Sequence, residues 1–573
     1  MGNKSVLSLM IAVSLLAACG PQDKQITPAA SPAYDLIIRN AIVYDGSGDA
    51  PKSIDIAIKN DRIAAHLKPG ENATATRVVD AQGRALAPGF INVLSWATES
   101  LIVDGRAQSD LRQGVTLEIF GEGWSMGPLN DAMKAEAIKQ QGDIRYPIEW
   151  TTLGEYLDYL QKRGVAVNVA SFVGATTLRI HELGYENRAP TPEELVRMQK
   201  LVSQSMDEGA LGVGASLIYA PAFYAKEDEL TALATTAGQS GGGYVAHMRS
   251  EANRLNEALD ELIRIGRKAN VHAEAYHLKA AGKENWPKMA TAIGQIEKAR
   301  SEGLSIAANM YTYRAGATGL DAAMPPWVQE GGHDTWVARL KDPKIRARVL
   351  REMRSPSKDW ENLYLLAGTA DGVRFIGFKN PKLKPLTGKT LAEVARMRNQ
   401  SPEDTMIDLV IEDDSRVDTA YFLMSEDNVK LGLSQHWVSL GSDAEASAPE
   451  GVFLKSSTHS RAYGNVARLL GHYVRDEKLM SLQEAIYRLT RLPASNWKLK
   501  DRGCLEPGCY ADLVIFEPAK IMDVATFDKP QQFATGVSNV WVNGIEVLQN
   551  GEPTGKLPGQ VVRGPGWKGW KTP

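Results

Sequence analysis

The sequence predicts an α/β fold: a (β/α)8 TIM-like barrel with an inserted lid, and a small β-sandwich built from both chain ends. Three observations predict it. The 573 residues exceed what one hydrophobic core organises. Apolar, strand-like runs alternate with helix-like stretches through the middle of the chain, and short segments of period two occur only near its ends.

A net charge of -3 offers no polycationic surface, which excludes nucleic acid as a partner.

Residues 1–19 have the pattern of a bacterial lipoprotein signal peptide. Lys4 precedes an apolar run at 6–16 that is too short to span a bilayer. The run ends in Leu-Ala-Ala-Cys-Gly at 16–20, which is similar to the lipoprotein box, whose cysteine is acylated and becomes the new N-terminus. We therefore expect an exported lipoprotein, anchored in the membrane through Cys19 and facing the periplasm or the cell exterior. An ordinary cleaved secretory signal is the alternative.

The two chain ends carry the predicted β-sandwich, at 34–86 and 505–562, after a tether at 20–33 that is rich in Pro, Ser and Ala. Period-two segments at 36–44, 54–58 and 62–66 are matched by others at 511–516, 537–542 and 545–548. An Asn-Gly turn at 543–544 favours a hairpin. Cys504 and Cys509 form either a small disulfide-closed turn or two unpaired thiols, because the sequence does not fix their separation.

Eight strand-like runs define the barrel at 87–504. They lie at 90–94, 116–120, 165–173, 211–217, 244–247, 272–277, 305–310 and 437–440. Helical patterns such as that at 252–267 separate them, as a (β/α)8 barrel requires. The interval at about 317–428 is too long for a loop, so we interpret it as an inserted lid or subdomain.

Polar residues that end these runs are the candidates for chemistry, because active sites of such barrels lie at the carboxyl ends of the strands. His247 ends one run and His277 ends the next, where alternation points His277 inward and His272 outward. One inward histidine on each of two consecutive strands is typical of a metal site. Two hydrogen-bonded core histidines are the alternative.

Two carboxylates end other runs. Glu122 lies between two glycines after the second run, where it is either a third metal ligand or a solvent-facing loop residue. Asp443 follows the last run, where it serves either as an acid/base group or as a helix N-cap.

Nine motifs occur in order along nearly the whole chain. They are Ala-Pro-Gly-Phe-Ile (87–91), Arg-Gln-Gly-Val-Thr (112–116), Gly-Ala-Leu-Gly-Val (209–213), Leu-Ile-Tyr-Ala-Pro (217–221), Ala-His-Met-Arg (246–249), His-Leu-Lys-Ala-Ala-Gly (277–282), Gly-Ala-Thr-Gly-Leu-Asp (316–321), Gly-Ser-Asp (441–443) and Arg-Ala-Tyr-Gly (461–464). With them the chain resembles the N-acyl-D-amino-acid deacylases, or D-aminoacylases, of the amidohydrolase superfamily.

The resemblance implies one zinc ion per chain, bound by a cysteine after the second strand and by histidines of the fifth and sixth. His247 and His277 match these histidines. The cysteine is absent, and Glu122 is the nearest replacement. Two histidines and one glutamate are an ordinary set for catalytic zinc, although a carboxylate also suits manganese.

Two departures from the family pattern concern the pocket. The superfamily usually has His-X-His on the first strand, where this chain has Leu94 and Trp96, which cannot bind a metal. This excludes the usual binuclear centre. Relatives also tend to carry a histidine in place of Ala175. Both changes suggest an altered substrate preference.

The resemblance further implies how a substrate is bound and cleaved. Lys279 and Arg461 match the family's grip on the substrate carboxylate, and Tyr311 is favoured over Tyr313 for its tyrosine. Alternatively, the two cations pair with local acids. We expect Asp443 to act as general base and then acid toward a metal-activated water.

The expected function is metal-dependent hydrolysis of a small carboxylate-bearing amide, which releases an amino acid and a carboxylate from an N-acyl, D-configured amino acid. A dipeptidase, a cyclic-amide hydrolase and a non-catalytic, lipid-anchored binding protein are the alternatives.

Overall fold

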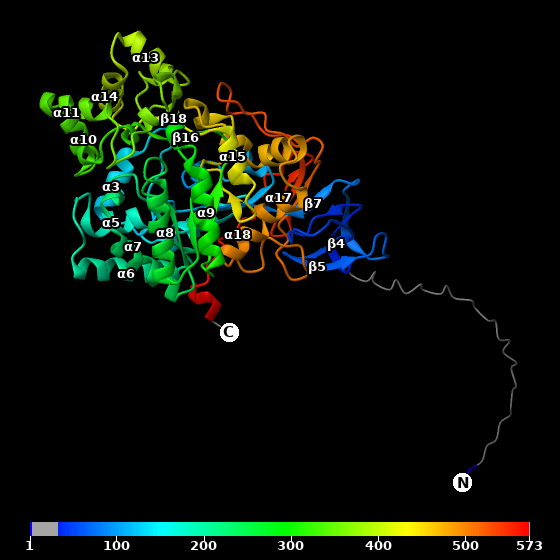
Figure 1. Cartoon of the computed structure of the whole chain (residues 1–573). Coiled ribbons are helices and arrows are strands. Elements are labelled where there is room, and N and C mark those ends of the chain that lie inside the picture. Colours follow the sequence, from blue (N-terminus) through cyan, green and yellow to red (C-terminus); the bar gives the residue numbers. More distant parts are fainter. Residues whose placement is uncertain (3–31, 572–573) are drawn as a thin grey trace.

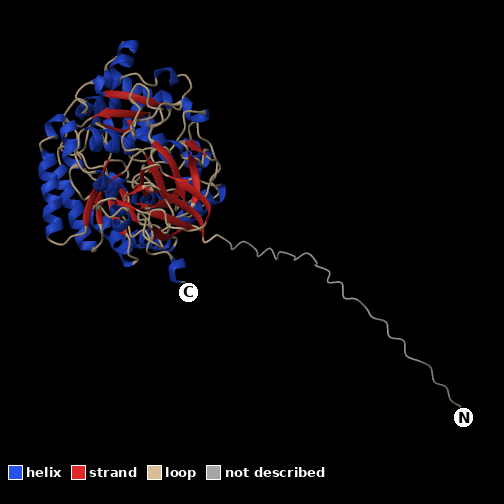
Figure 2. Cartoon of the chain, turned by 90° about the vertical axis from the view of Figure 1, so that its right-hand side faces the viewer, coloured by secondary structure: helices blue, strands red, loops and turns tan. Residues whose placement is uncertain are grey.

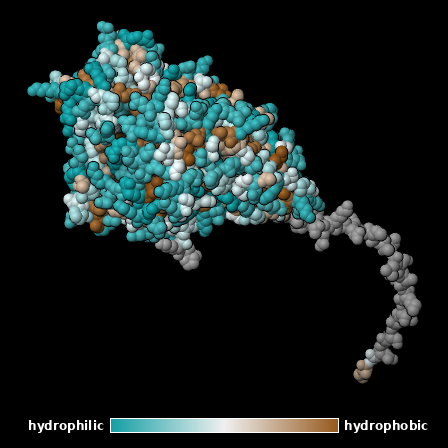
Figure 3. Space-filling view, in the orientation of Figure 1, coloured by the Kyte–Doolittle hydropathy of each residue, from teal (hydrophilic) through white to brown (hydrophobic). Residues whose placement is uncertain are grey.

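The computed structural model describes residues 1–2 and 32–571, and Figure 1 shows the whole chain. Cys19, the signal peptide and all but the last residues of the tether lie outside the described residues, so lipidation and export stay predictions. No helix in the described part of the chain is long and apolar enough to cross a membrane. On the face shown in Figure 3, hydrophilic residues predominate and hydrophobic ones are scattered.

The strands in the middle of the chain are parallel and follow one another in sequence order. They are β8 (Phe90–Asn92), β9 (Val115–Phe120), β10 (Asn168–Ser171) continued by β11 (Val173–Gly174), β12 (Gly212–Ser216), β13 (Gly243–His247), β14 (Ala273–Ala275), β15 (Ile306–Met310) and β19 (Val438–Leu440). Their residues are all buried, as expected for parallel strands covered on both faces.

Hydrogen bonds between the last and the first of these strands close the ring. The backbone N–H of Val93 donates to Leu440 O at 3.3 Å, and that of Asp443 donates to Leu94 O at 2.8 Å. All eight runs predicted from the sequence are therefore strands of one α/β barrel.

Helices stack along the outside of the strands (Figure 2). They include α4 (Leu153–Arg163), α5 (Ala175–Leu183), α6 (Pro192–Asp207), α7 (Glu227–Gln239), α8 (Leu255–Ala269), α9 (Lys288–Ser301), α15 (Glu426–Leu433), α16 (Arg461–Arg468), α17 (Leu482–Leu489) and α18 (Arg491–Asn496). In α8, Leu255, Leu259 and Leu262 recur at helical spacing and are buried against the barrel, while charged residues face outward.

Both chain ends contribute to one terminal sheet, as predicted. Its order is β23 (Glu552–Pro553), β22 (Ile545–Gln549), β21 (Val537–Val542), β20 (Leu513–Phe516), β7 (Ala85–Pro88), β2 (Ile42–Val43) and β3 (Lys52–Ser53). A second sheet has the order β5 (Arg62–Leu67), β4 (Asp55–Lys59), β1 (Tyr34–Arg39) and β6 (Ala75–Asp80). Ile38, Ile56, Leu86, Leu513 and Trp541 from the two sheets share one apolar core.

Cys504 and Cys509 form a disulfide, with their Cα atoms 6.1 Å apart. The structure thus selects the first of the two alternatives that the sequence left open.

The segment between β15 and β19 has its own core and its own sheet. Strands β16 (Ala315–Gly319), β18 (Asp418–Phe422) and β17 (Val373–Gly377) pair antiparallel. Helices α10 (His333–Lys341), α11 (Pro343–Met353), α13 (Leu391–Arg398) and α14 (Pro402–Asp413) lie together at one end of the molecule (Figure 1). One contact between the segment and the barrel is made by Glu361, whose carboxylate accepts a hydrogen bond from Ser250 Oγ at 2.6 Å.

Candidate active site

The predicted site residues meet where the barrel strands end. Glu122 lies two residues after β9, His247 is the last residue of β13, and His277 lies two residues after β14. Asp443 follows β19 at the same end of the barrel. His277 and Asp443 both have left-handed backbones, with φ of 34° and 51°. Such conformations are costly for residues with side chains and cluster at functional sites.

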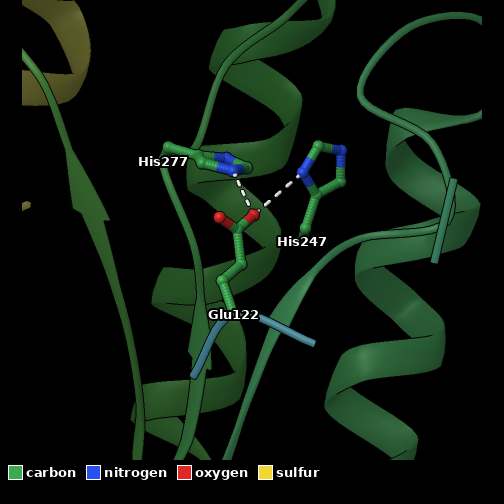
Figure 4. A group of neighbouring side chains, drawn as sticks. All are labelled: Glu122, His247 and His277. Atoms are coloured by element: carbon green, nitrogen blue, oxygen red, sulfur yellow. Dashed lines mark hydrogen bonds and ion pairs between the residues drawn. The ribbon is translucent and has the colours of Figure 1, made fainter. Parts of the chain in front are cut away.

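Glu122 lies between the two imidazoles (Figure 4). Its Oε1 atom is 3.1 Å from His247 Nδ1 and 2.9 Å from His277 Nε2. All three side chains are buried, and their potential ligand atoms lie within 4.8 Å of one another. The interpretation of Glu122 as a solvent-facing loop residue is therefore wrong.

The glycines on either side of Glu122 allow this geometry. Gly121 and Gly123 have φ of 106° and 73°, which favour glycine. A Cβ atom would lie 2.4 Å from Phe172 O at the first position and 2.5 Å from Ser216 Oγ at the second. The loop can thus approach the neighbouring strands closely and direct Glu122 inward.

The electrostatics of the three residues favour a cation between them. Burial alone would raise the pKa of Glu122, but His277 and His247 outweigh it and hold that pKa below its usual range. Burial and Lys279 lower the pKa of His277, yet Glu251 and Glu122 raise it to about 9. A proton is thus held where ligands of this kind would bind a metal, which must displace it.

The donor set fits zinc. His247 directs Nδ1 to Glu122; within the described residues its Nε2 atom makes no hydrogen bond, and Glu251 Oε2 lies 3.5 Å from it. Two imidazoles and one carboxylate that converge in a buried position at a barrel mouth form a donor set that suits an open catalytic zinc site.

Glu251 is a site residue that the sequence analysis missed. Its carboxylate lies 3.0 Å from His277 Nδ1 and accepts hydrogen bonds from Lys279 Nζ at 2.7 and 2.8 Å. A carboxylate on the second nitrogen of a ligand histidine fixes the orientation of the ring. The available signal was its position four residues after His247.

Asp443 is held by two donors. Arg461 Nη2 lies 2.9 Å from Oδ2, and the Trp96 indole N–H donates to Oδ1 at 3.0 Å. Burial raises the pKa of Asp443 against the opposing charge of Arg461. No helix begins at this residue, so the helix N-cap interpretation is wrong.

Arg461 and Tyr311 provide buried donors that face the site. The Arg461 guanidinium carbon lies 4.5 Å from the centre of the Tyr311 ring. Within the described structure, neither Arg461 Nε, Arg461 Nη1 nor the Tyr311 hydroxyl has a hydrogen-bond partner. The other candidate, Tyr313, instead donates to Asp523 at 3.1 Å. His459 supports Arg461 by accepting a hydrogen bond from its backbone N–H at 3.0 Å.

Both candidate cations also pair with local acids, Lys279 with Glu251 and Arg461 with Asp443. The pairing leaves two guanidinium nitrogens of Arg461 free. The Lys279 ammonium, in contrast, already makes two hydrogen bonds to Glu251. Arg461 and Tyr311 are thus better placed than Lys279 to receive a carboxylate.

Known proteins are similar to this chain over most of its length. Residues 77–548 match the model described as "Amidohydrolase family". The chain is 31% identical to a D-aminoacylase of Alcaligenes xylosoxydans xylosoxydans, over 93% of this chain and 98% of the relative. It is 30% identical to an N-acyl-D-aspartate deacylase of the same organism, over 94% and 97%.

Solved structures are similar over the same length. One is an N-acyl-D-glutamate deacylase of Bordetella bronchiseptica, complexed with zinc and a phosphonate mimic of the tetrahedral intermediate. It has a TM-score of 0.75 and 27% identity, over 92% of this chain and 99% of that one. A D-aminoacylase structure has a TM-score of 0.76 and 29% identity, over 92% and 100%. That D-aminoacylase is described as having a binuclear metal centre, in which one metal activates the enzyme and a second metal attenuates it.

Proposed function

The chain belongs to the amidohydrolase family, and to its D-aminoacylase branch, and on that premise we propose that it is an N-acyl-D-amino-acid deacylase. Its substrate would be a linear amide with a free carboxylate, cleaved by water into an amino acid and a carboxylic acid. The observation that carries the proposal is the buried set of Glu122, His247 and His277 beside Asp443.

Glu122, His247 and His277 would hold one zinc ion; manganese is the alternative metal that the carboxylate allows. When bound there, zinc would supply Lewis-acid chemistry: it polarises a carbonyl oxygen and makes water more acidic. The Glu251 carboxylate would orient His277 for this role through their contact of 3.0 Å.

Arg461 and Tyr311 would bind the carboxylate of the substrate. The free Nε and Nη1 atoms of Arg461 offer two donors to one carboxylate, and the unpartnered hydroxyl of Tyr311 offers a third. This grip would position the amide carbon beside Asp443, because Arg461 lies 2.9 Å from that residue and would also contact the substrate.

Asp443 would move the proton. It removes one proton from the attacking water, and a C–O bond forms at the amide carbon. The C–N bond then breaks as Asp443 donates that proton to the leaving amine. The raised pKa of Asp443 supports the second half of this cycle, because it brings the carboxyl closer to neutral pH.

The test is metal content together with a substrate panel on the purified protein. We expect about one zinc per chain and hydrolysis of N-acetyl D-amino acids at least about 100-fold faster than that of their L-isomers. A hydantoin and a dipeptide in the same panel test the two alternative hydrolases. Absence of both metal and turnover would contradict the proposal and favour a non-catalytic binding protein.

Arg461→Met should raise KM for N-acyl amino acids, because it removes the bidentate donor while keeping similar volume. We expect kcat/KM to fall about 100-fold, which corresponds to a lost charged hydrogen-bond pair. The matched comparison is the same substrate with its carboxylate amidated. If Arg461 binds the carboxylate, the variant should discriminate little between acid and amide; an unchanged preference for the acid would contradict the assignment.

A further inference from the structure

We infer that Trp96 is a positioning residue whose indole N–H holds Glu122 and Asp443 together and occupies the place that a second metal ion would need. The inference rests on the proposed function and adds to it how the number of metals is set. At this position the chain has a tryptophan, which cannot bind a metal, where the resemblance to the superfamily implies a histidine.

One N–H of Trp96 serves both carboxylates. Its Nε1 atom lies 3.1 Å from Glu122 Oε2 and 3.0 Å from Asp443 Oδ1. Three-centre bonds of this kind are common in proteins. An indole nitrogen is a donor only, so the two oxygens are satisfied by a group that cannot itself bind a metal.

Each carboxylate divides its two oxygens between the indole and a different partner. Glu122 directs Oε1 to His247 and His277 and gives Oε2 to Trp96. Asp443 directs Oδ2 to Arg461 and gives Oδ1 to Trp96. The indole N–H therefore occupies a place that is within hydrogen-bond distance of both remaining oxygens. Two carboxylate oxygens that face one point are a typical site for a cation.

The end of the first barrel strand supplies no substitute ligand in the described structure. Leu94 is apolar and buried. Asn92 donates to Glu118 and Ser442, each at 2.8 Å, and its carbonyl oxygen accepts from Ser442 N at 2.8 Å. A second ion would therefore have to displace the indole and would gain no imidazole in exchange. The structure assigns to this chain a centre that takes one metal.

In one experiment, metal-free protein is titrated with cobalt(II), and binding is followed by the absorption of the bound ion. In a second experiment, the protein is loaded with zinc, and the zinc that stays bound is measured after gel filtration. We expect the wild-type protein to saturate at one equivalent and to keep its turnover in excess zinc. Trp96→His places an imidazole beside both carboxylates. It should take up a second, weaker equivalent and lose activity as zinc is added.

Trp96→Phe keeps an aromatic ring and removes the shared N–H. It should still bind one equivalent, while kcat falls about tenfold and KM changes less than about twofold, because Asp443 loses an anchor that acts on the reaction and not on binding. Trp124→Phe is the matched control: both tryptophans are 38% exposed, and Trp124 bonds to neither carboxylate. It should leave stoichiometry and kcat unchanged.

Three results would overturn the inference while leaving the proposed function standing: two equivalents bound by the wild-type protein, wild-type kcat in folded Trp96→Phe, or no second equivalent in folded Trp96→His. Circular dichroism establishes folding for each variant. A wild-type protein without metal or turnover would instead overturn the proposed function, and the inference with it.

Discussion

Asp443→Asn is expected to lower kcat about 1,000-fold while zinc stays bound, because a carboxamide cannot carry the proton from water to the leaving amine. The substitution preserves shape. An amide oxygen can still accept a hydrogen bond from Arg461, which lies 2.9 Å from Oδ2, so the substrate grip should persist and KM should change little. Steady-state kinetics with N-acetyl D-amino acids, and zinc analysis of the same preparation, measure both expectations.

The control for this substitution is Asp523→Asn. Asp523 also lies near an arginine, with Arg468 Nη1 at 3.4 Å, and it accepts a hydrogen bond from Tyr313, the tyrosine that has no part in the proposed substrate grip. We expect kcat within about twofold of wild type for the control. If Asp443→Asn retained wild-type kcat with its zinc in place, Asp443 would not be the acid/base group.

Most of the barrel was predictable from the sequence because its signals are local. A buried parallel strand is a short apolar run, and a polar residue that ends the run lies at the mouth of the barrel. These two signals alone predict that His247, His277, Glu122 and Asp443 lie at one end of the barrel. Alternation within one run was enough to orient His277 inward.

What escaped prediction depends on contacts between distant residues. The sequence shows only that Trp96 cannot bind a metal, whereas its importance lies in the hydrogen bonds it donates to Glu122 and Asp443. The role of Glu251 likewise follows from its contacts with His277 and Lys279, which the sequence does not show. No pattern along the chain encodes which donor and acceptor meet across a barrel mouth.

Glu122→Ala is expected to abolish turnover by removing the metal. The variant leaves two imidazoles without the carboxylate that lies between them, and two histidine ligands alone do not complete a zinc site. Zinc should fall from about one per chain to well below it. The pKa of His277 should also fall, since Glu122 is one of the two acids that raise it. Elemental analysis and histidine titration by nuclear magnetic resonance measure these effects.

A second cluster makes the metal measurement decisive. Glu426, His472 and Glu477 also bring three such donors together, but they are partly exposed at the surface. Glu426→Ala should leave both the tightly bound zinc and the turnover unchanged. If zinc were instead lost in Glu426→Ala and retained in Glu122→Ala, the metal would belong to the surface cluster, and Glu122 would not be a ligand.

Glu122→Cys separates loss of the ligand from damage to the loop. This variant resembles the family pattern, which has a cysteine in the neighbourhood of position 122. A thiolate binds zinc at about 2.3 Å, and the glycines on both sides keep the loop close to the neighbouring strands whichever side chain is present. We expect Glu122→Cys to regain about one zinc per chain and measurable hydrolysis. The same variant loses the acceptor that Trp96 now contacts. Its kcat should therefore stay below wild type even when zinc is fully restored, because the indole would then anchor Asp443 alone.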